Sequence, residues 1–249
     1  MGTFIRLLAA DGHDFDAYVA NPVRSKTADG TAQDGGGAGA VVVIQEIFGI
    51  NQHIRDVTDR FAAAGYLAIA PALFDRAGGG IELGYDADGV AKGRALKDDV
   101  DAHSANDVMA AITYAAGHDD TAGKVVIVGF CWGGSLAWRM ACASDNAGLV
   151  GAVSYYGGAL VGPHNQAVAH CPVMAHFGLN DASIPEAGAR EFTASQQAVK
   201  SYFYDADHGF NCDQRGQYDA ASAGLAWERT TAFLQRHLRT DIGAPNERP

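Results

Sequence analysis

The sequence contains no apolar run that approaches the roughly 20 residues that a membrane-spanning helix needs, so a membrane protein is not expected. Positive charge is also scarce, because 18 Lys and Arg residues stand against 29 Asp and Glu residues and the formal net charge is −11. Nucleic-acid affinity comes mainly from basic side chains that neutralise phosphates, so we expect no nucleic-acid partner. The N-terminal segment turns acidic too soon for a secretory signal peptide, which predicts a cytoplasmic protein.

Cysteine is sparse as well, and its spacing argues against two common roles. No CxxC pair and no metal-finger spacing is present among the four cysteines, which are Cys131, Cys142, Cys171 and Cys212. Without a secretion signal, a disulfide framework is not expected. The histidines are likewise scattered over different segments, so we expect neither a metal ion nor another cofactor. What remains is whether one thiol is chemically active or whether all four are small core residues.

Strand-like and helix-like segments alternate along most of the chain, which predicts an α/β fold built around a mainly parallel sheet. Only the start differs, because 3–9 and 14–20 read as an N-terminal hairpin. The further predicted strands are 40–45, 67–70, 124–130, 149–156, 171–178 and 201–204. Helices are predicted at 53–64, 97–116, 132–143, 184–200 and 222–238.

Three segments are expected to be irregular within what reads as a single domain over residues 1–249. Residues 21–39 are rich in Gly, Ser, Thr and Asp and predict a mobile surface loop. Residues 72–96 carry six glycines and predict an active-site lid. The tail at 241–249 is expected to be frayed.

The strongest local signal is the segment GFCWGG at 129–134, which lies between a predicted buried strand and a predicted helix. It has the form of a nucleophile elbow, glycine–x–nucleophile–x–glycine, with Cys131 in the central position. Glycines are needed there because the turn is strained and larger side chains would clash with the neighbouring strand and helix. The N-terminus of the helix favours the thiolate form of the cysteine. The rival interpretation is that the glycines and Cys131 serve packing alone.

A nucleophile of this kind needs a base, and the base needs an orienting group. In this fold the chain order is nucleophile, acid, histidine. Asp181 and His208 each follow a predicted strand, so both lie at the same edge of the sheet as Cys131. Two alternatives stay open: Asp181 caps the following helix, or Asp205 or Asp207 orients His208 instead.

An acyl-transfer site also needs hydrogen-bond donors for the oxyanion. We predict the backbone N–H of Trp132, directly after the nucleophile, and that of Ile47 in the loop after the strand 40–45. Glu46 precedes Ile47 at the end of a core strand, and a buried acid there needs a partner. Its alternative role is a structural salt bridge with Arg55 or Arg76.

The chain resembles the dienelactone hydrolases, or carboxymethylenebutenolidases, over about residues 3–238. The resemblance rests on the motifs QEIFGI (45–50), APALFDR (70–76), GFCWGG (129–134), GLND (178–181) and HGF (208–210). It implies an eight-stranded α/β-hydrolase domain and a triad of Cys131, His208 and Asp181. It further implies that Ile47 and Trp132 donate to the oxyanion.

The resemblance also implies roles for three side chains around the thiol. Glu46 holds and tunes the thiol, Arg76 binds a substrate carboxylate and Tyr156 lines the pocket. One departure concerns the second arginine that dienelactone-degrading members carry four residues after the catalytic histidine. That position is Cys212 in this chain, and Arg215 would replace the arginine only if the loop bends back.

Taken together, the sequence predicts a cysteine-dependent hydrolase that cleaves a lactone or small ester through a thioester on Cys131. The expected partner is a small molecule, with or without a carboxylate, and the chain is expected to be a monomer or a homodimer. A second hypothesis is a redox-sensing thiol on a hydrolase-like scaffold. A third, a non-catalytic ligand-binding module, is disfavoured by the presence of all three triad residues.

Overall fold

The computed structural model describes residues 1–23, 38–143, 148–162 and 166–239. Most of the segment predicted to be a mobile loop at 21–39, and the tail at 241–249, lie outside the described residues. Among the residues described, no helix has the length and apolar composition to cross a membrane.

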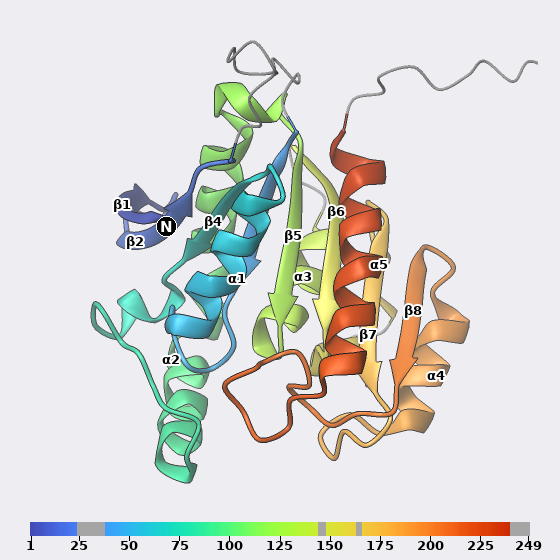
Figure 1. The fold of residues 1–249 in the computed structure, drawn as a ribbon. Coiled ribbons are helices and arrows are strands. Elements are labelled where there is room, and N and C mark those ends of the chain that lie inside the picture. The colour runs from blue at the N-terminus through green and yellow to red at the C-terminus, as the bar shows by residue number, and fades with distance from the viewer. Residues whose placement is uncertain (24–37, 144–147, 163–165, 240–249) are drawn as a thin grey trace, which may run out of the picture.

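Eight strands form one sheet in the order β1-β2-β4-β3-β5-β6-β7-β8 (Figure 1). The strands are β1 Thr3–Leu8, β2 Asp14–Ala20, β3 Ala40–Ile44, β4 Leu67–Pro71, β5 Val125–Phe130, β6 Leu149–Tyr155, β7 Val173–Gly178 and β8 Val199–Tyr204. β1 and β2 form the antiparallel hairpin and β2 pairs antiparallel with β4, whereas the pairs from β4 to β8 are parallel. The predicted α/β fold with a mainly parallel sheet is confirmed.

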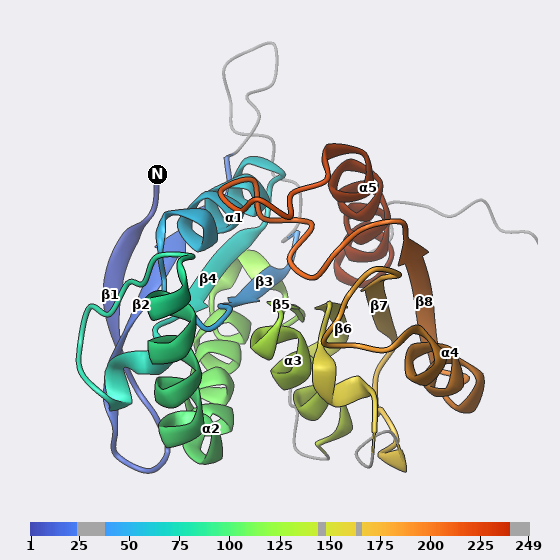
Figure 2. The ribbon, with the colours of Figure 1, turned by 90° about the horizontal axis from the view of Figure 1, so that it is seen from below.

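Helices cover both faces of this sheet, which is why the central strands are continuous apolar runs. β3 and β5 are buried along their whole length, as the β-branched pattern predicts. Figure 2 shows α1 (Gln52–Ala63) and α5 (Ala220–Leu238) on one face. The other face carries α2 (Ala87–Ala116), α3 (Trp132–Cys142) and α4 (Glu186–Ser195). Short 3₁₀ turns η1 (Leu73–Arg76), η2 (Asp119–Thr121) and η3 (Gly158–Leu160) complete the described elements.

The predicted lid at 72–96 is wrong in its second half, because α2 begins at Ala87. Asp86 caps the helix by accepting a hydrogen bond from the Gly89 N–H at 2.7 Å. The two glycines that suggested a loop, Gly89 and Gly93, lie inside the helix. A Cβ at Gly89 would overlap the carbonyl of Gly84, and one at Gly93 would overlap that of Ile47. These glycines therefore permit close packing of α2, which composition alone does not distinguish from flexibility.

The predicted helix 184–200 is also too long. α4 ends at Ser195, and the Val199 N–H bonds to the Gln196 carbonyl at 3.1 Å as the chain turns into β8. Val199 then pairs in parallel register with Val173 of β7. Sheet pairing, which is a long-range interaction, decides where this helix stops.

Candidate active site

The turn between β5 and α3 holds Cys131 in a strained backbone conformation, with φ 55° and ψ −114°. For a residue other than glycine this conformation costs on the order of 1–3 kcal/mol and persists only where the surroundings impose it. A Cβ at Gly129 would overlap the carbonyl of Gly133, and one at Gly133 would overlap the carbonyls of Ile44 and Gln45. The two glycines thus let the helix start directly against the strands, which is the geometry expected of a nucleophile elbow.

His208 and Asp181 meet across the loops that follow β8 and β7. The His208 Nδ1 lies 2.7 Å from the Asp181 Oδ2, and Asp181 is 5% exposed. The other oxygen of Asp181 accepts hydrogen bonds from the N–H groups of Ser183 and Ile184 at 2.8 and 3.2 Å. Asp181 therefore orients the ring and also caps the turn that precedes α4, so the two roles weighed from the sequence coexist.

The rival acids do not bond to this ring in the described part of the chain. Asp205 accepts a hydrogen bond from the Asn180 side chain at 3.0 Å. Asp207 is exposed and lines the cavity described below. Of the three candidate acids, Asp181 is the one that holds the imidazole of His208.

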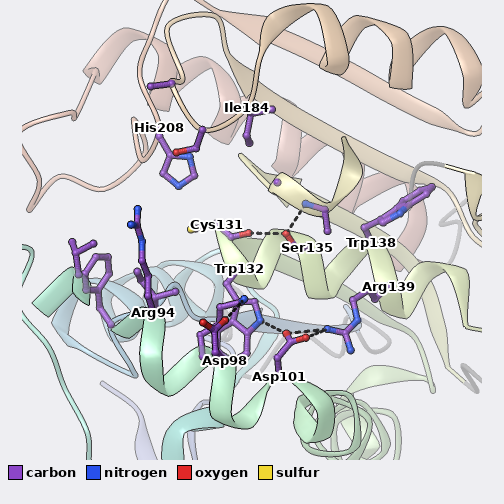
Figure 3. Close-up of a pocket in the computed structure, with 18 of the residues that line it drawn as sticks. Arg94, Asp98, Asp101, Cys131, Trp132, Ser135, Trp138, Arg139, Ile184 and His208 are labelled. Carbon is purple, nitrogen blue, oxygen red and sulfur yellow. Dashed lines mark hydrogen bonds and ion pairs between the residues drawn. The ribbon is translucent and has the colours of Figure 1, made fainter. Parts of the chain in front are cut away.

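The imidazole of His208 faces Cys131 (Figure 3). Burial by itself lowers the pKa of His208, but the hydrogen bond to Asp181 and the interaction with Cys131 outweigh it and raise that pKa to about 10. His208 is therefore protonated at neutral pH in the resting site. The arrangement is an imidazolium held between a buried carboxylate and a cysteine side chain.

Tyr156 lies behind His208 and is not among the residues that line the cavity. Its ring centroid is 5.0 Å from that of His208 and 5.5 Å from that of Phe210. The side chain is fully buried, and its hydroxyl has no hydrogen-bond partner among the described residues. The predicted pocket-lining role is thus not supported, and Tyr156 instead backs the imidazole ring.

Glu46 pairs with Arg215, a partner that the sequence analysis did not consider for it. The Arg215 Nη1 lies 3.0 Å from the Glu46 Oε1, and Glu46 is 1% exposed. Of the two partners that were considered, Arg55 pairs with Glu82 at 2.6 Å and Arg76 pairs elsewhere. The buried acid is compensated, and an arginine is anchored beside the predicted nucleophile.

The loop after β8 does bend so that Arg215 reaches the cavity. The Cys212 N–H bonds to the Gly209 carbonyl, and the Arg215 N–H bonds to the Cys212 carbonyl, so two successive turns reverse the chain. Gly209 has φ 83°, and a Cβ there would meet the guanidinium at 2.5 Å. The guanidinium also lies over the rings of Phe48 and Tyr85, at 5.5 and 5.7 Å.

Cys212, at the position of the expected arginine, is fully buried and donates to the Tyr85 hydroxyl at 3.3 Å. Burial raises the pKa of Cys212, Cys142 and Cys171 to about 11 each. Thiols in such environments stay protonated at neutral pH and react slowly. These three cysteines are poor nucleophiles.

Arg76 corrects the sequence analysis. Its guanidinium bonds to both oxygens of the fully buried Asp107, at 2.8 and 2.6 Å, and it pairs with Asp11 at 2.9 Å. It does not line the cavity. Because η1 turns Arg76 toward α2, the side chain neutralises a buried acid instead of facing a substrate.

A cavity of about 1340 Å³ opens above Cys131 and includes His208 and Arg215. The two predicted oxyanion donors, Ile47 and Trp132, also line it. Trp132 is the first residue of α3, where backbone N–H groups have no acceptor within the helix. The predicted nucleophile, base and oxyanion donors thus surround one volume.

Arg94 also lines this cavity, although no motif in the sequence pointed to it. Figure 3 shows its side chain rising from α2 toward His208. Of the described cations around the cavity, Lys97, Arg139, Arg215 and His208 each pair with a carboxylate, whereas Arg94 forms no ion pair with another described residue. Arg94 falls in the segment 72–96, which was predicted to be irregular. Its position on the cavity wall follows from the start of α2 at Ala87.

The Trp132 side chain is held from α2. Its indole N–H donates to the Asp101 Oδ1 at 2.6 Å, and Arg139 donates to both oxygens of Asp101 at 3.0 and 2.9 Å (Figure 3). Because the backbone N–H of Trp132 is a predicted oxyanion donor, we propose that Asp101 is a positioning residue that acts through the tryptophan.

We expect Asp101→Ala to lower kcat for ester hydrolysis by roughly 10- to 100-fold with little change in KM, since a loosened donor weakens oxyanion binding. Asp101→Asn keeps an acceptor oxygen for the indole and should recover part of that loss. Asp99→Ala removes an exposed acid from the same helix outside the cavity and serves as the control. Equal kcat in the Asp101→Ala and Asp99→Ala variants would contradict the positioning role.

The elbow after β5 and the loops after β7 and β8 occupy the positions at which α/β-hydrolases carry their catalytic residues, and the protein is an α/β-hydrolase. Solved structures support this class. One from Klebsiella pneumoniae, provisionally named a dienelactone hydrolase, is 31% identical with a TM-score of 0.73 and covers 94% of this chain and 98% of its own. A dienelactone hydrolase-like promiscuous phosphotriesterase from metagenomic libraries, 20% identical with a TM-score of 0.72, covers 95% and 98% and shares the fold.

Within this class the chain belongs to the dienelactone hydrolase family, whose model matches residues 15–238. A carboxymethylenebutenolidase from Pseudomonas putida is 33% identical over 245 residues, which is 92% of this chain and 94% of that protein. A protein from Synechocystis sp. that bears the same name provisionally is 38% identical over 220 residues, covering 80% and 86%. The protein is accordingly an ester or lactone hydrolase.

Proposed function

We propose that this protein hydrolyses a lactone or small activated ester through a Cys131–His208–Asp181 triad and a thioester intermediate. The observation that carries the proposal is the Asp181-bound imidazole of His208, which faces Cys131 in the cavity. A nucleophile, a base and an orienting carboxylate in this relation are the minimal set for covalent acyl transfer.

In the acylation step, the Cys131 thiolate attacks the substrate carbonyl and forms a C–S bond. The N–H groups of Ile47 and Trp132 bind the negative oxygen of the tetrahedral intermediate. As the C–O bond breaks, the imidazolium of His208 gives its proton to the leaving oxygen. The products of this step are a thioester on Cys131 and an alcohol or enol, which leaves when the substrate is an ester and stays attached to the acyl group when it is a lactone.

In the deacylation step, His208 acts as the base. The thioester sulfur carries no negative charge, so one of the interactions that raise the pKa of His208 is gone. The neutral ring accepts a proton from water while the water oxygen attacks the thioester carbonyl. Collapse of the intermediate releases the carboxylic acid and regenerates the thiolate, with Asp181 orienting the ring throughout.

This mechanism favours substrates with good leaving groups. With a poor leaving group, the tetrahedral intermediate expels the thiolate in preference to the alkoxide or amine. Enol lactones and aryl esters therefore fit the site, and amides do not.

We also propose that Arg94 binds a carboxylate on the substrate. Arg94 has no ion pair among the described residues and projects toward His208, so a carboxylate beside the reacting carbonyl gains a charge-assisted contact. Arg215 lies on the same cavity but already pairs with Glu46. We propose that Arg215 assists Arg94 in binding the carboxylate and so substitutes for the second arginine, whose position Cys212 occupies.

The test compares two aryl acetates that differ only in a carboxylate on the leaving group, 3-acetoxybenzoate and 3-acetoxytoluene. We expect the wild type to prefer the charged ester and Arg94→Ala to lower that preference about tenfold. Lys92→Ala removes a nearby exposed charge of α2 outside the cavity and should keep it. A preference that is the same in all three proteins would exclude Arg94 as the carboxylate site.

The rival hypothesis, a redox-sensing thiol, gains no specific support. A sensor needs a reactive cysteine but does not need an imidazole aligned by a buried carboxylate. The bond between His208 and Asp181 is superfluous for sensing and necessary for hydrolysis.

A further inference from the structure

The cavity extends past Cys131 along α3. On this helix Ser135, Trp138, Arg139 and Cys142 line it in turn, at the three- to four-residue spacing of one helical face. Figure 3 shows this face leading away from Cys131. With a rise of about 1.5 Å per residue, the distance from Cys131 to Cys142 is roughly 16 Å. We call this extension the α3 groove.

The walls of the α3 groove carry no uncompensated charge among the described residues. On the α2 side, Lys97 pairs with Asp98 at 2.8 Å, and Asp101 pairs with Arg139 at 2.9 Å. The lining also includes the small residues Gly158, Ala159, Ala167 and Ala143. Pockets that bind apolar groups are lined mainly by hydrophobic and aromatic side chains, which Trp138 and these alanines supply here.

The wall nearest Cys131 is fixed by Ser135. Its Oγ accepts a hydrogen bond from the Ala159 N–H at 3.0 Å, and it contacts the Cys131 carbonyl at 3.5 Å (Figure 3). The η3 turn is thereby tied to the first turn of α3. The groove begins as a defined slot beside the nucleophile.

The volume is larger than a small lactone requires. Sites for small molecules usually measure about 300–1,000 Å³, whereas this cavity measures about 1340 Å³. A substrate that fills only the space between Cys131, His208 and Arg94 leaves the α3 groove empty. An extended substrate uses both parts.

We propose that the α3 groove binds an extended apolar acyl chain, so that the protein prefers medium-chain acyl esters or alkyl-substituted lactones to acetyl esters. This inference rests on the proposed function. His208 must protonate the leaving oxygen, so the leaving group lies on the side of His208. The α3 groove runs away from His208 on the other side of Cys131, which assigns it to the acyl part (Figure 3).

The test measures kcat/KM for p-nitrophenyl acetate and p-nitrophenyl octanoate. We expect the wild type to prefer octanoate and Ala159→Phe, which fills the slot, to lower the octanoate-to-acetate ratio by about tenfold or more. Cys142→Phe blocks only the far end and should lower the ratio for dodecanoate more than for octanoate. Ala91→Phe, an exposed position of α2 outside the cavity, is the matched control and should keep the wild-type ratios.

A second measurement, inhibition of the wild type by free fatty acids, tests the groove even if a variant fails to fold or is inactive. Octanoate should inhibit acetate-ester hydrolysis by the wild type competitively and about tenfold more strongly than butyrate does. If esters are hydrolysed without chain preference and octanoate inhibits no better than butyrate, the groove proposal is overturned while the proposed function stands. If no ester is hydrolysed, the proposed function fails, and calorimetric binding of octanoate to wild type and Ala159→Phe still decides the groove.

Discussion

Replacing Cys131 with alanine is expected to lower the turnover of p-nitrophenyl acetate by about 10⁴-fold or more, to a rate that stopped-flow absorbance no longer separates from background. The physical reason is the loss of the proposed nucleophile, the thiol that faces His208 in the cavity. Without it, His208 and the oxyanion donors can only assist direct attack by water. The loss should appear in kcat/KM and in the burst of product at early times.

The matched control is Cys171→Ala, which removes a free thiol that does not line the cavity. It should hydrolyse the ester at the wild-type rate. Mass spectrometry after an acid quench should find one acyl group on wild-type protein, in the peptide that contains Cys131. Turnover by Cys131→Ala at the wild-type rate would refute the nucleophile assignment.

Replacing His208 with glutamine is expected to lower kcat by about 10³-fold, since both proton transfers depend on this ring. Deacylation should suffer most, so the acyl-enzyme should accumulate in this variant. His103→Gln, which removes an exposed histidine of α2, is the control. Unaltered kcat in His208→Gln would exclude its role as acid and base.

The pH dependence follows from the raised pKa of His208, which is about 10 in the folded protein. Because kcat/KM reports the free enzyme and acylation needs the protonated ring, kcat/KM should fall as pH rises through about 10. The same shift affects stability. A pKa above the unfolded value of 6.5 stabilises the fold fully below pH 6.5, and this contribution is lost as pH rises toward 10.

Unfolding in urea at several pH values measures this contribution as the difference between wild type and His208→Gln. The difference should shrink between pH 6.5 and 10. A difference that grows over this range would contradict the ion pair between His208 and Asp181.

Local patterns in the sequence were sufficient for the elbow and for the order of the elements. The segment GFCWGG combines a strained turn with close backbone contacts, and both Gly129 and Gly133 have neighbours that leave no room for a Cβ. The carboxyl ends of parallel strands lie at the same edge of the sheet. Because Asp181 and His208 each follow such a strand, both could be placed near Cys131 from the sequence.

Side-chain partners could not be read in the same way. Glu46 and Arg215 are 169 positions apart, and their bond depends on two consecutive turns after His208. For a similar reason, Arg94 lines the cavity, whereas Arg76, the residue predicted to bind the substrate, does not. Which of them faces the cavity depends on how η1 and the first turns of α2 pack. In the sequence Gly93 suggests a loop, but in the structure it lets α2 pack closely against the Ile47 carbonyl.

The sequence by itself determined the α/β architecture, the strained Cys131 elbow and the placement of Asp181 and His208 at strand ends near it, because each depends on periodicity, strand order or local backbone geometry. Only the tertiary structure decided that Arg215 neutralises Glu46, that Arg94 is the unpaired cation among the described cavity residues and that the cavity continues along α3. Those features depend on long side chains and on helix packing. Their directions are set by contacts between residues distant in the chain, which no local pattern encodes.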